Sequence, residues 1–157
     1  MGPCAIAADT KLETPEGPLT VKTVGNSPTA VMTRTDDGLV RFAMSTEVRK
    51  VAEAQPVLRI VLDNGRALRV GADQRLFDHA MEARPAGSLQ TGTELVSAFA
   101  FPAGYEYVTD DGETVRSNGT VKIISIGPGG DADLYSLKIA LTGRFVFSSG
   151  VIGAAEA

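Results

Sequence analysis

The sequence has no tryptophan, one cysteine and one histidine, and only six phenylalanines and three tyrosines among its 157 residues. The lone cysteine, Cys4, excludes an intrachain disulfide and a cysteine-cluster metal site, because both need a second thiol. The longest apolar runs, such as residues 123–126, are far shorter than the ~20 residues that cross a bilayer, and no basic start precedes an apolar stretch at the N-terminus. We therefore expect neither a transmembrane segment nor a signal peptide in this chain, and the sequence indicates no compartment.

The charge balance has no cationic excess. Fifteen Lys and Arg against nineteen Asp and Glu give a net charge of −4, so no basic surface is available to neutralise phosphates or anionic lipid. We expect no nucleic-acid partner and no membrane partner. The acidic pairs at 36–37 and 110–111 each precede a glycine and suit turns, whereas a calcium site needs a longer run of alternating oxygen ligands. We expect no metal and no cofactor.

Seventeen glycines and eight prolines predict a turn-rich fold with an aliphatic core. The clearest signal is a hairpin in which residues 57–62 and 66–70 flank the turn Asp63-Asn64-Gly65. Further hairpins are predicted over residues 11–21, 30–44 and 121–141, the last with its turn at 127–130, together with strands over 45–54 and 93–100. Residues 83–89 can hold at most one helical turn, because they contain Pro85.

About ten or more short strands result, and the predicted fold class is all-β. We expect residues 5–157 to form a single domain that is monomeric, and we interpret residues 1–4 as upstream flanking sequence or an artificial remnant.

The opening stretch, residues 5–17, resembles the first block of the hedgehog/intein (Hint) family. That block reads nucleophile, three variable residues, Asp or Gly, and then Thr. With Thr10 as that Thr, the nucleophile position falls on Ala5, and Cys4 lies one residue upstream. A second stretch, residues 68–77, is similar to the family's strand followed by Thr-x-x-His, with Gly71 in place of Thr, Asp73 between, and Gln74 in place of His.

The rest of the chain continues the resemblance in the same order. Residues 82–95 look like the family's connecting stretch, and residues 134–155 resemble its closing blocks, which normally contain Tyr-Asp-Leu and a terminal His-Asn pair. Ser136 stands in the place of Asp, while Ala154 and Ala155 stand in the place of His-Asn. The resemblance implies the Hint fold, a compact horseshoe-like β domain. Residues 104–120 are too few for the homing endonuclease that inteins insert near this place.

The resemblance also implies an ancestral activity, which is protein splicing or autocatalytic cleavage of the domain's own flanking polypeptide segments. A thiol or hydroxyl attacks the preceding carbonyl, and the terminal Asn cyclises to release the other end. Ala5 supplies no nucleophile, and Ala155 has no carboxamide. Gln74 can donate a hydrogen bond but cannot exchange a proton near neutral pH. We therefore expect a degenerate or mutationally inactivated domain, and natural loss explains these substitutions together more easily than mutagenesis.

Several residues keep two interpretations. Cys4 could be a nucleophile in a register shifted by one residue, although an inert side chain is favoured. Ser136 could be a nucleophile, although a local hydrogen bond is favoured. Asp9 and Thr10 could orient the N-terminal junction or form an ordinary turn. The single histidine, His79, is expected to be a solvated loop residue.

A different class of function competes with self-processing. The chain could be a non-catalytic β scaffold or partner-binding module within a larger protein. That alternative predicts a precursor that stays uncleaved under every condition.

Overall fold

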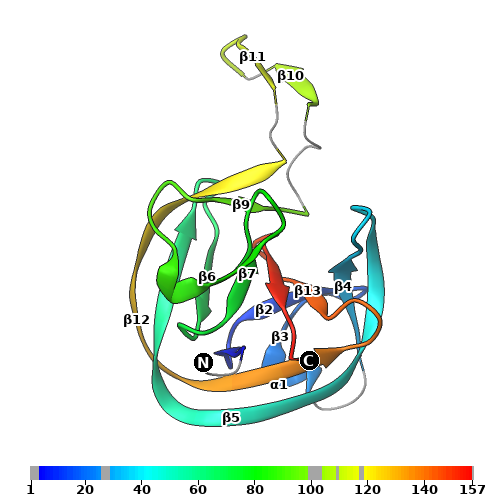
Figure 1. Cartoon of the computed structure of the whole chain (residues 1–157), viewed down its shortest axis with the longest axis vertical. Helices are drawn as coiled ribbons and strands as arrows, with labels where there is room; N and C mark the ends of the chain where they lie inside the picture. Colours follow the sequence, from blue (N-terminus) through cyan, green and yellow to red (C-terminus); the bar gives the residue numbers. More distant parts are fainter. Residues whose placement is uncertain (1–3, 26–28, 99–103, 109, 117–118, 157) are drawn as a thin grey trace.

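The computed structural model describes residues 4–25, 29–98, 104–108, 110–116 and 119–156, and it confirms the all-β fold class (Figure 1). The strands of these ranges are β1 (Ile6–Ala7), β2 (Lys11–Thr14), β3 (Gly17–Thr20), β4 (Ala30–Arg34), β5 (Val40–Leu62), β6 (Ala67–Val70), β7 (Arg75–Phe77), β8 (Ala83–Pro85), β9 (Glu94–Val96), β10 (Glu106–Val108), β11 (Thr114–Arg116), β12 (Thr120–Ile139), β13 (Arg144–Val146) and β14 (Ile152–Ala154). Within the same ranges, helical structure is limited to the α-helix α1 (Val21–Val24) and the 3-10 helix η1 (Ala86–Ser88). Neither helix is long and apolar enough to cross a membrane.

Two long strands form the frame of the molecule. β5 and β12 pair antiparallel from Leu62 opposite Ile123 to Ser45 opposite Ile139. Figure 1 shows them running side by side around one side and the bottom of the domain, which gives the horseshoe outline. β6 and β1 complete the frame, because β5 pairs with β6, β6 with β1, and β1 with β12. The N-terminal strand is therefore held between two others rather than at an edge.

The predicted hairpin with its turn at residues 127–130 is wrong. β12 continues through this stretch, and Pro128 lies opposite Leu58 of β5. The register shifts between Pro128 and Asp131, so the glycines of this stretch lie in a β-bulge and the chain does not reverse its direction there. A Cβ on Gly129 would lie 3.0 Å from the backbone nitrogen of Arg59, which shows how closely the two backbones approach.

The other predicted hairpins form. β2 and β3 pair across residues 15–16, β4 and β5 across residues 36–38, and β5 and β6 across Asp63-Asn64-Gly65. Gly65 has φ of 81°, the conformation that makes glycine favourable in such a turn. The strands expected at 45–54 and 57–62 are parts of one strand, β5, in which Ala54 adopts φ of 48°. A hairpin of β10 and β11 stands apart from the main sheets (Figure 1).

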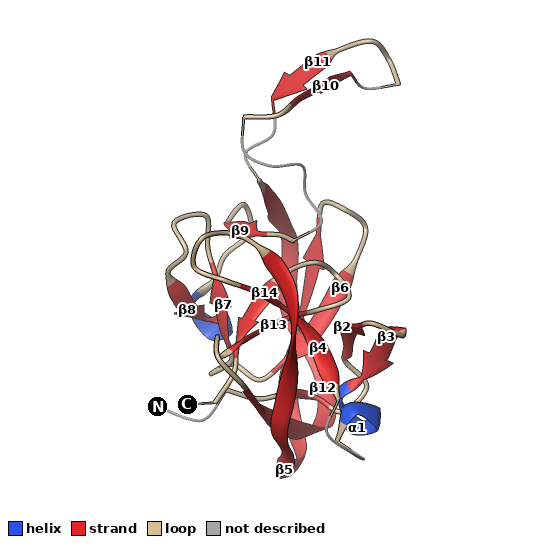
Figure 2. Cartoon of the chain, turned by 90° about the vertical axis from the view of Figure 1, so that its right-hand side faces the viewer, coloured by secondary structure: helices blue, strands red, loops and turns tan. Residues whose placement is uncertain are grey.

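The core is mainly aliphatic, as the composition predicts. A second sheet, in the order β13-β14-β7-β8, contributes its buried side chains to that core. Both helical segments lie at the periphery of the domain (Figure 2). Phe145 and Phe147 meet edge to face, with ring centroids 5.0 Å apart. Gly153 of β14 lies directly against both rings, so this position has no room for a side chain.

We predict that Gly153→Ala lowers the free energy of unfolding by about 1–3 kcal/mol, the usual cost of overpacking a filled core. The added Cβ would lie 2.7 Å from Phe147 Cε2 and 2.8 Å from Phe145 Cζ. Gly127→Ala is the matched control, because a Cβ there meets no atom within 4 Å. Chemical denaturation measures both, and equal stability of the two variants would contradict the packing described.

Candidate functional site

Both ends of the described chain are bound by neighbouring residues of β12. The hydroxyl of Ser136 donates a hydrogen bond to the carbonyl oxygen of Cys4. The amide of Glu156 donates to the carbonyl oxygen of Leu137 over 2.7 Å. The first and last described residues of the chain are therefore held by two consecutive residues of one strand.

Ser136 occupies an inward-facing position of β12 and is 1 % exposed. Ser136 makes a hydrogen bond, as expected, but the prediction that its partner is local is wrong. The partner, Cys4, lies 132 positions away in the sequence. A buried hydroxyl needs a partner, and here the backbone of the N-terminal segment provides one. The side chain thus joins two segments that the sequence pattern does not connect.

Ala5 lies beside the turn that follows β6. Its carbonyl oxygen accepts a hydrogen bond of 2.9 Å from the amide of Gly71, and its methyl group is 3 % exposed. A Cβ on Gly71 would lie 3.3 Å from that same oxygen, so the glycine permits a close approach of the two backbones. A threonine at this position would require the Ala5 segment to shift by a few tenths of an ångström.

Gln74 is buried at the centre of the site, with 1 % of its surface exposed. Its side-chain nitrogen donates to the carbonyl oxygen of Ala154 over 2.8 Å and to that of Arg75 over 2.9 Å. The backbone amide of Gln74 closes the turn by donating to Gly71. The side-chain nitrogen of Gln74 is therefore directed at the backbone of the C-terminal strand β14 and of its own neighbour Arg75.

The structure brings the residues expected at the site into one region. Cys4 is buried, and its Sγ lies 4.0 Å from the carbonyl oxygen of Asp73, whose own side chain is exposed. Ala154 contacts Gln74, while the amide of Ala155 donates to Gly143 over 2.8 Å.

An open cavity of about 320 Å³ adjoins Ala5. It extends from the turn after β6 to the bend of β5. Its lining residues are Ala5, Val51, Ala52, Gln55, Pro56, Gly71, Ala72, Asp73 and Leu134. Apolar side chains supply most of the wall, so the cavity offers space next to Ala5, and Asp73 is the one ionisable residue of its lining.

The one lysine of β5, Lys50, is no general base. Lys50 lies opposite Tyr135, which precedes Ser136. The hydrogen bond with Glu53 raises the pKa of Lys50, and the charge of Asp133 acts in the same direction. The amine therefore stays protonated near neutral pH. His79 is exposed, as expected, and no cluster of metal-binding side chains occurs in the described ranges.

Asp9 and Thr10 connect the N-terminal segment to β6. Thr10 donates its hydroxyl to the carbonyl oxygen of Arg69 over 2.8 Å, and both carboxylate oxygens of Asp9 lie 2.9 Å from Nη1 of Arg69. Sequence reasoning missed Arg69 and the carbonyl of Leu137. An alternation of exposed and buried residues marks Arg69 only as a strand residue, and a backbone carbonyl has no signature in the sequence.

We predict that Ser136→Ala lowers the free energy of unfolding by about 1–3 kcal/mol, because the buried carbonyl oxygen of Cys4 loses its donor. Ser125→Ala serves as control, since Ser125 is exposed on the same strand. Guanidinium denaturation compares the two. A loss no greater than that of the control would show that the hydroxyl does not hold the N-terminal segment.

Solved structures share this architecture along their whole length. A variant of the Ssp DnaB mini-intein superimposes with a TM-score of 0.77 and 13 % identity, over 100 % of this chain and 97 % of that one. A DnaB intein from Synechocystis sp. PCC 6803 gives 0.73 and 14 %, over 98 % and 99 %. The bacterial intein-like domain from Clostridium thermocellum gives 0.75 and 13 %, over 99 % and 100 %.

No protein-family model and no curated protein sequence matches this chain. The similarity therefore concerns the course of the backbone, and it covers nearly the whole chain, including both of its ends. The chain has the hedgehog/intein (Hint) fold in its minimal form, without an inserted endonuclease domain.

Proposed function

We propose that this chain is a self-processing domain of the intein type that still binds both of its junctions but no longer cleaves them. One observation carries the proposal. Ser136 donates a hydrogen bond to the Cys4 carbonyl, the group that a nucleophile at position 5 would attack, while Ala5 presents only a methyl group there.

The N-terminal junction has an oxyanion donor without a nucleophile. In this type of chemistry, the attacked carbonyl oxygen gains negative charge, and a hydrogen-bond donor that is already in place stabilises it. Ser136 occupies that place with respect to Cys4. The attacking thiol or hydroxyl would have to come from residue 5, and alanine has neither, so the first step of the acyl shift does not occur.

Proton transfer is impaired as well. The leaving amide nitrogen of Ala5 must be protonated, and Gln74 stands where the family has histidine. Its amide is bound to Ala154 and Arg75, and an amide does not exchange a proton near neutral pH. Loss of a general acid alone typically lowers a rate by about 10²–10⁴.

The C-terminal junction is held but has no means of release. Ala155 lacks the carboxamide that would cyclise onto its own carbonyl. The next residue, Glu156, is fixed through its amide by Leu137 and through its carboxylate by Arg49, whose Nη2 lies 2.8 Å away. The partners of such a domain are the polypeptide segments on its two sides, which stay connected through it.

The first experiment places one folded reporter before Cys4 and another after Ala157, and follows intact mass for roughly a day with and without added thiol. We predict an unchanged mass in both conditions, because residue 5 cannot attack. Thiol-dependent loss of the N-terminal reporter would instead identify Cys4 as the nucleophile in a shifted register, and would overturn the proposal.

Uncleaved precursor alone does not separate a silent self-processing domain from a scaffold of different function. The variant Ala5→Cys/Gln74→His restores the nucleophile and the proton donor in the same fusion. We predict thiol-dependent cleavage between residues 4 and 5, at a rate about 10²-fold or more above that of Ala5→Cys alone.

Ala8→Cys/Gln74→His is the matched control, since it adds a thiol three residues beyond position 5 and should not cleave. If the Ala5→Cys/Gln74→His protein keeps its folded spectrum and remains intact, the self-processing interpretation fails. The alternative of a non-catalytic β module would then be favoured.

A further inference from the structure

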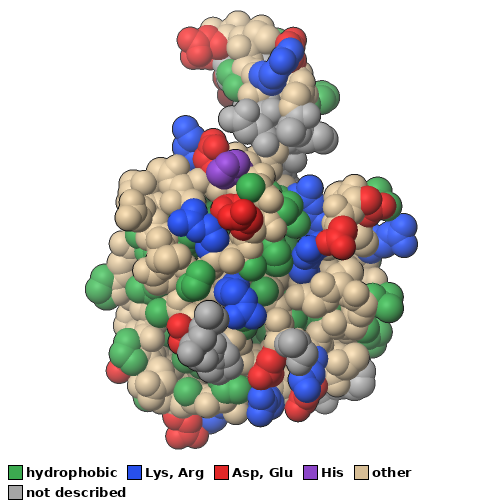
Figure 3. Space-filling view, in the orientation of Figure 1, with side chains coloured by type: hydrophobic (Ala, Val, Ile, Leu, Met, Phe, Trp, Pro, Cys, Tyr) green, Lys and Arg blue, Asp and Glu red, His purple; other side chains and the backbone are tan. Residues whose placement is uncertain are grey.

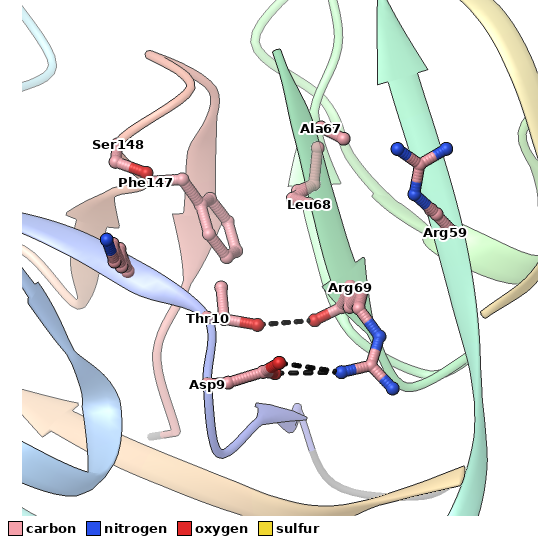
Figure 4. A pocket seen from close by; sticks show the side chains of 9 residues that line it. Asp9, Thr10, Arg59, Ala67, Leu68, Arg69, Phe147 and Ser148 are labelled. Carbon is pink, nitrogen blue, oxygen red and sulfur yellow. Dashed lines mark hydrogen bonds and ion pairs between the residues drawn. The ribbon is translucent and has the colours of Figure 1, made fainter. Parts of the chain in front are cut away.

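A second hollow, of about 210 Å³, lies on the surface beside β2 and β6 (Figure 4). Its walls come from the segment that enters β2, from β5 and β6, and from the turn after β13. The buried side chains of Leu68 and Phe147 give it an apolar part. Figure 4 shows Arg59 and Ser148 on opposite sides, with Phe147 and Leu68 between them.

Positive charge gathers at this hollow in a chain whose net charge is −4. Lys11, Arg59 and Arg69 line it, and Asp9 is the single acidic residue of the lining. Elsewhere, on the face drawn in Figure 3, cationic and anionic side chains are interspersed. The lining of the hollow therefore has a net charge of +2, whereas the whole chain has a net charge of −4.

Two of the three cations have no partner in the described part of the chain. Arg69 is compensated, because it pairs with Asp9 at 2.9 Å and donates to the carbonyl of Gly129 at 2.8 Å. The side chains of Lys11 and Arg59 make no hydrogen bond or ion pair with any described residue.

The position of Arg59 makes this lack of a partner unfavourable. It stands directly opposite Arg69 in the ladder between β5 and β6. Like charges that face each other across an antiparallel pair destabilise a sheet. A bound anion would turn this repulsion into an attraction.

The walls of the hollow are fixed before any ligand arrives. Ser148 donates its amide to the carbonyl of Lys11 over 2.9 Å and accepts a bond of 2.6 Å from Nη1 of Arg66. The hydroxyl of Thr10 holds the backbone of Arg69 from the other side. Binding would therefore order little besides the ends of Lys11 and Arg59.

We propose that this hollow binds a phosphate dianion, either free or as a small phosphate monoester. Lys11, Arg59 and Ser148 line different walls of the hollow. A tetrahedral oxyanion can accept hydrogen bonds from several directions at once, and arginine and lysine are its usual ligands. The volume exceeds the ~30 Å³ of a water molecule several-fold and admits such a group. The proposal is independent of the self-processing function.

Titration of the isotopically labelled full chain with inorganic phosphate, followed by amide chemical shifts at constant ionic strength and about pH 8, tests this proposal. We expect saturable shifts at Lys11, Arg59 and Ser148. Phosphoserine as free amino acid forms the second arm, since tighter binding of phosphoserine than of phosphate would identify a monoester as the ligand and tighter binding of phosphate the free ion.

Arg59→Gln should weaken binding by about tenfold or more, the loss of one charge-assisted contact. Arg41→Gln removes an exposed arginine elsewhere on β5 and should change the affinity less than twofold. Phosphate should also raise the melting temperature of the unmodified chain but not of the Arg59→Gln protein. Equal weakening by both substitutions, or linear shifts without saturation, would overturn the proposal.

Discussion

The antiparallel ladder between β5 and β12 is the interaction on which the rest of the structure depends. It brings Ser136 and Leu137 to the place where the two ends of the chain meet, and each of these residues binds one end. β1 pairs with β6 on one side and with β12 on the other. The site is thus a consequence of the frame.

This separation of frame and chemistry explains how the fold persists at 13–14 % identity to solved inteins. The bonds that hold the two ends of the described chain are made largely by backbone groups, such as the amide of Gly71 on Ala5 and the carbonyl of Leu137 on Glu156. A backbone carbonyl is present whatever the side chain, and so is a backbone amide unless the residue is proline. In the function that we propose, the nucleophile and the acid are side chains, so alanine at position 5 and glutamine at position 74 would remove the reaction and leave the binding geometry.

Much of the fold could be predicted from the sequence, because turns such as Asp63-Asn64-Gly65 have local causes. Pro128 was misread for the same reason: a local rule assigns its glycine-rich surroundings to a turn, whereas pairing with β5 keeps them in a strand. The Hint resemblance singled out Ala5, Gln74 and Ser136 in the sequence. It could not give the partner of Ser136, since a contact across 132 residues depends on the path of the whole chain.

The phosphate hollow illustrates the same limit. Lys11, Arg59 and Arg69 are spread over three strands and are unremarkable in a sequence with a net negative charge. Only the register between β5 and β6 sets Arg59 opposite Arg69. The two sites lie on the same segments, since Asp9 and Thr10 follow Ala5 closely and Arg69 precedes Gly71.

Amide hydrogen exchange in a protein with folded domains attached at both ends tests the central claim most directly. The account predicts that the amides of Gly71 and Glu156, which bind Ala5 and Leu137, exchange about as slowly as the paired amides of β12. Exchange of both amides at the rate of an unstructured peptide, with β12 still protected, would show that the frame forms without holding its junctions.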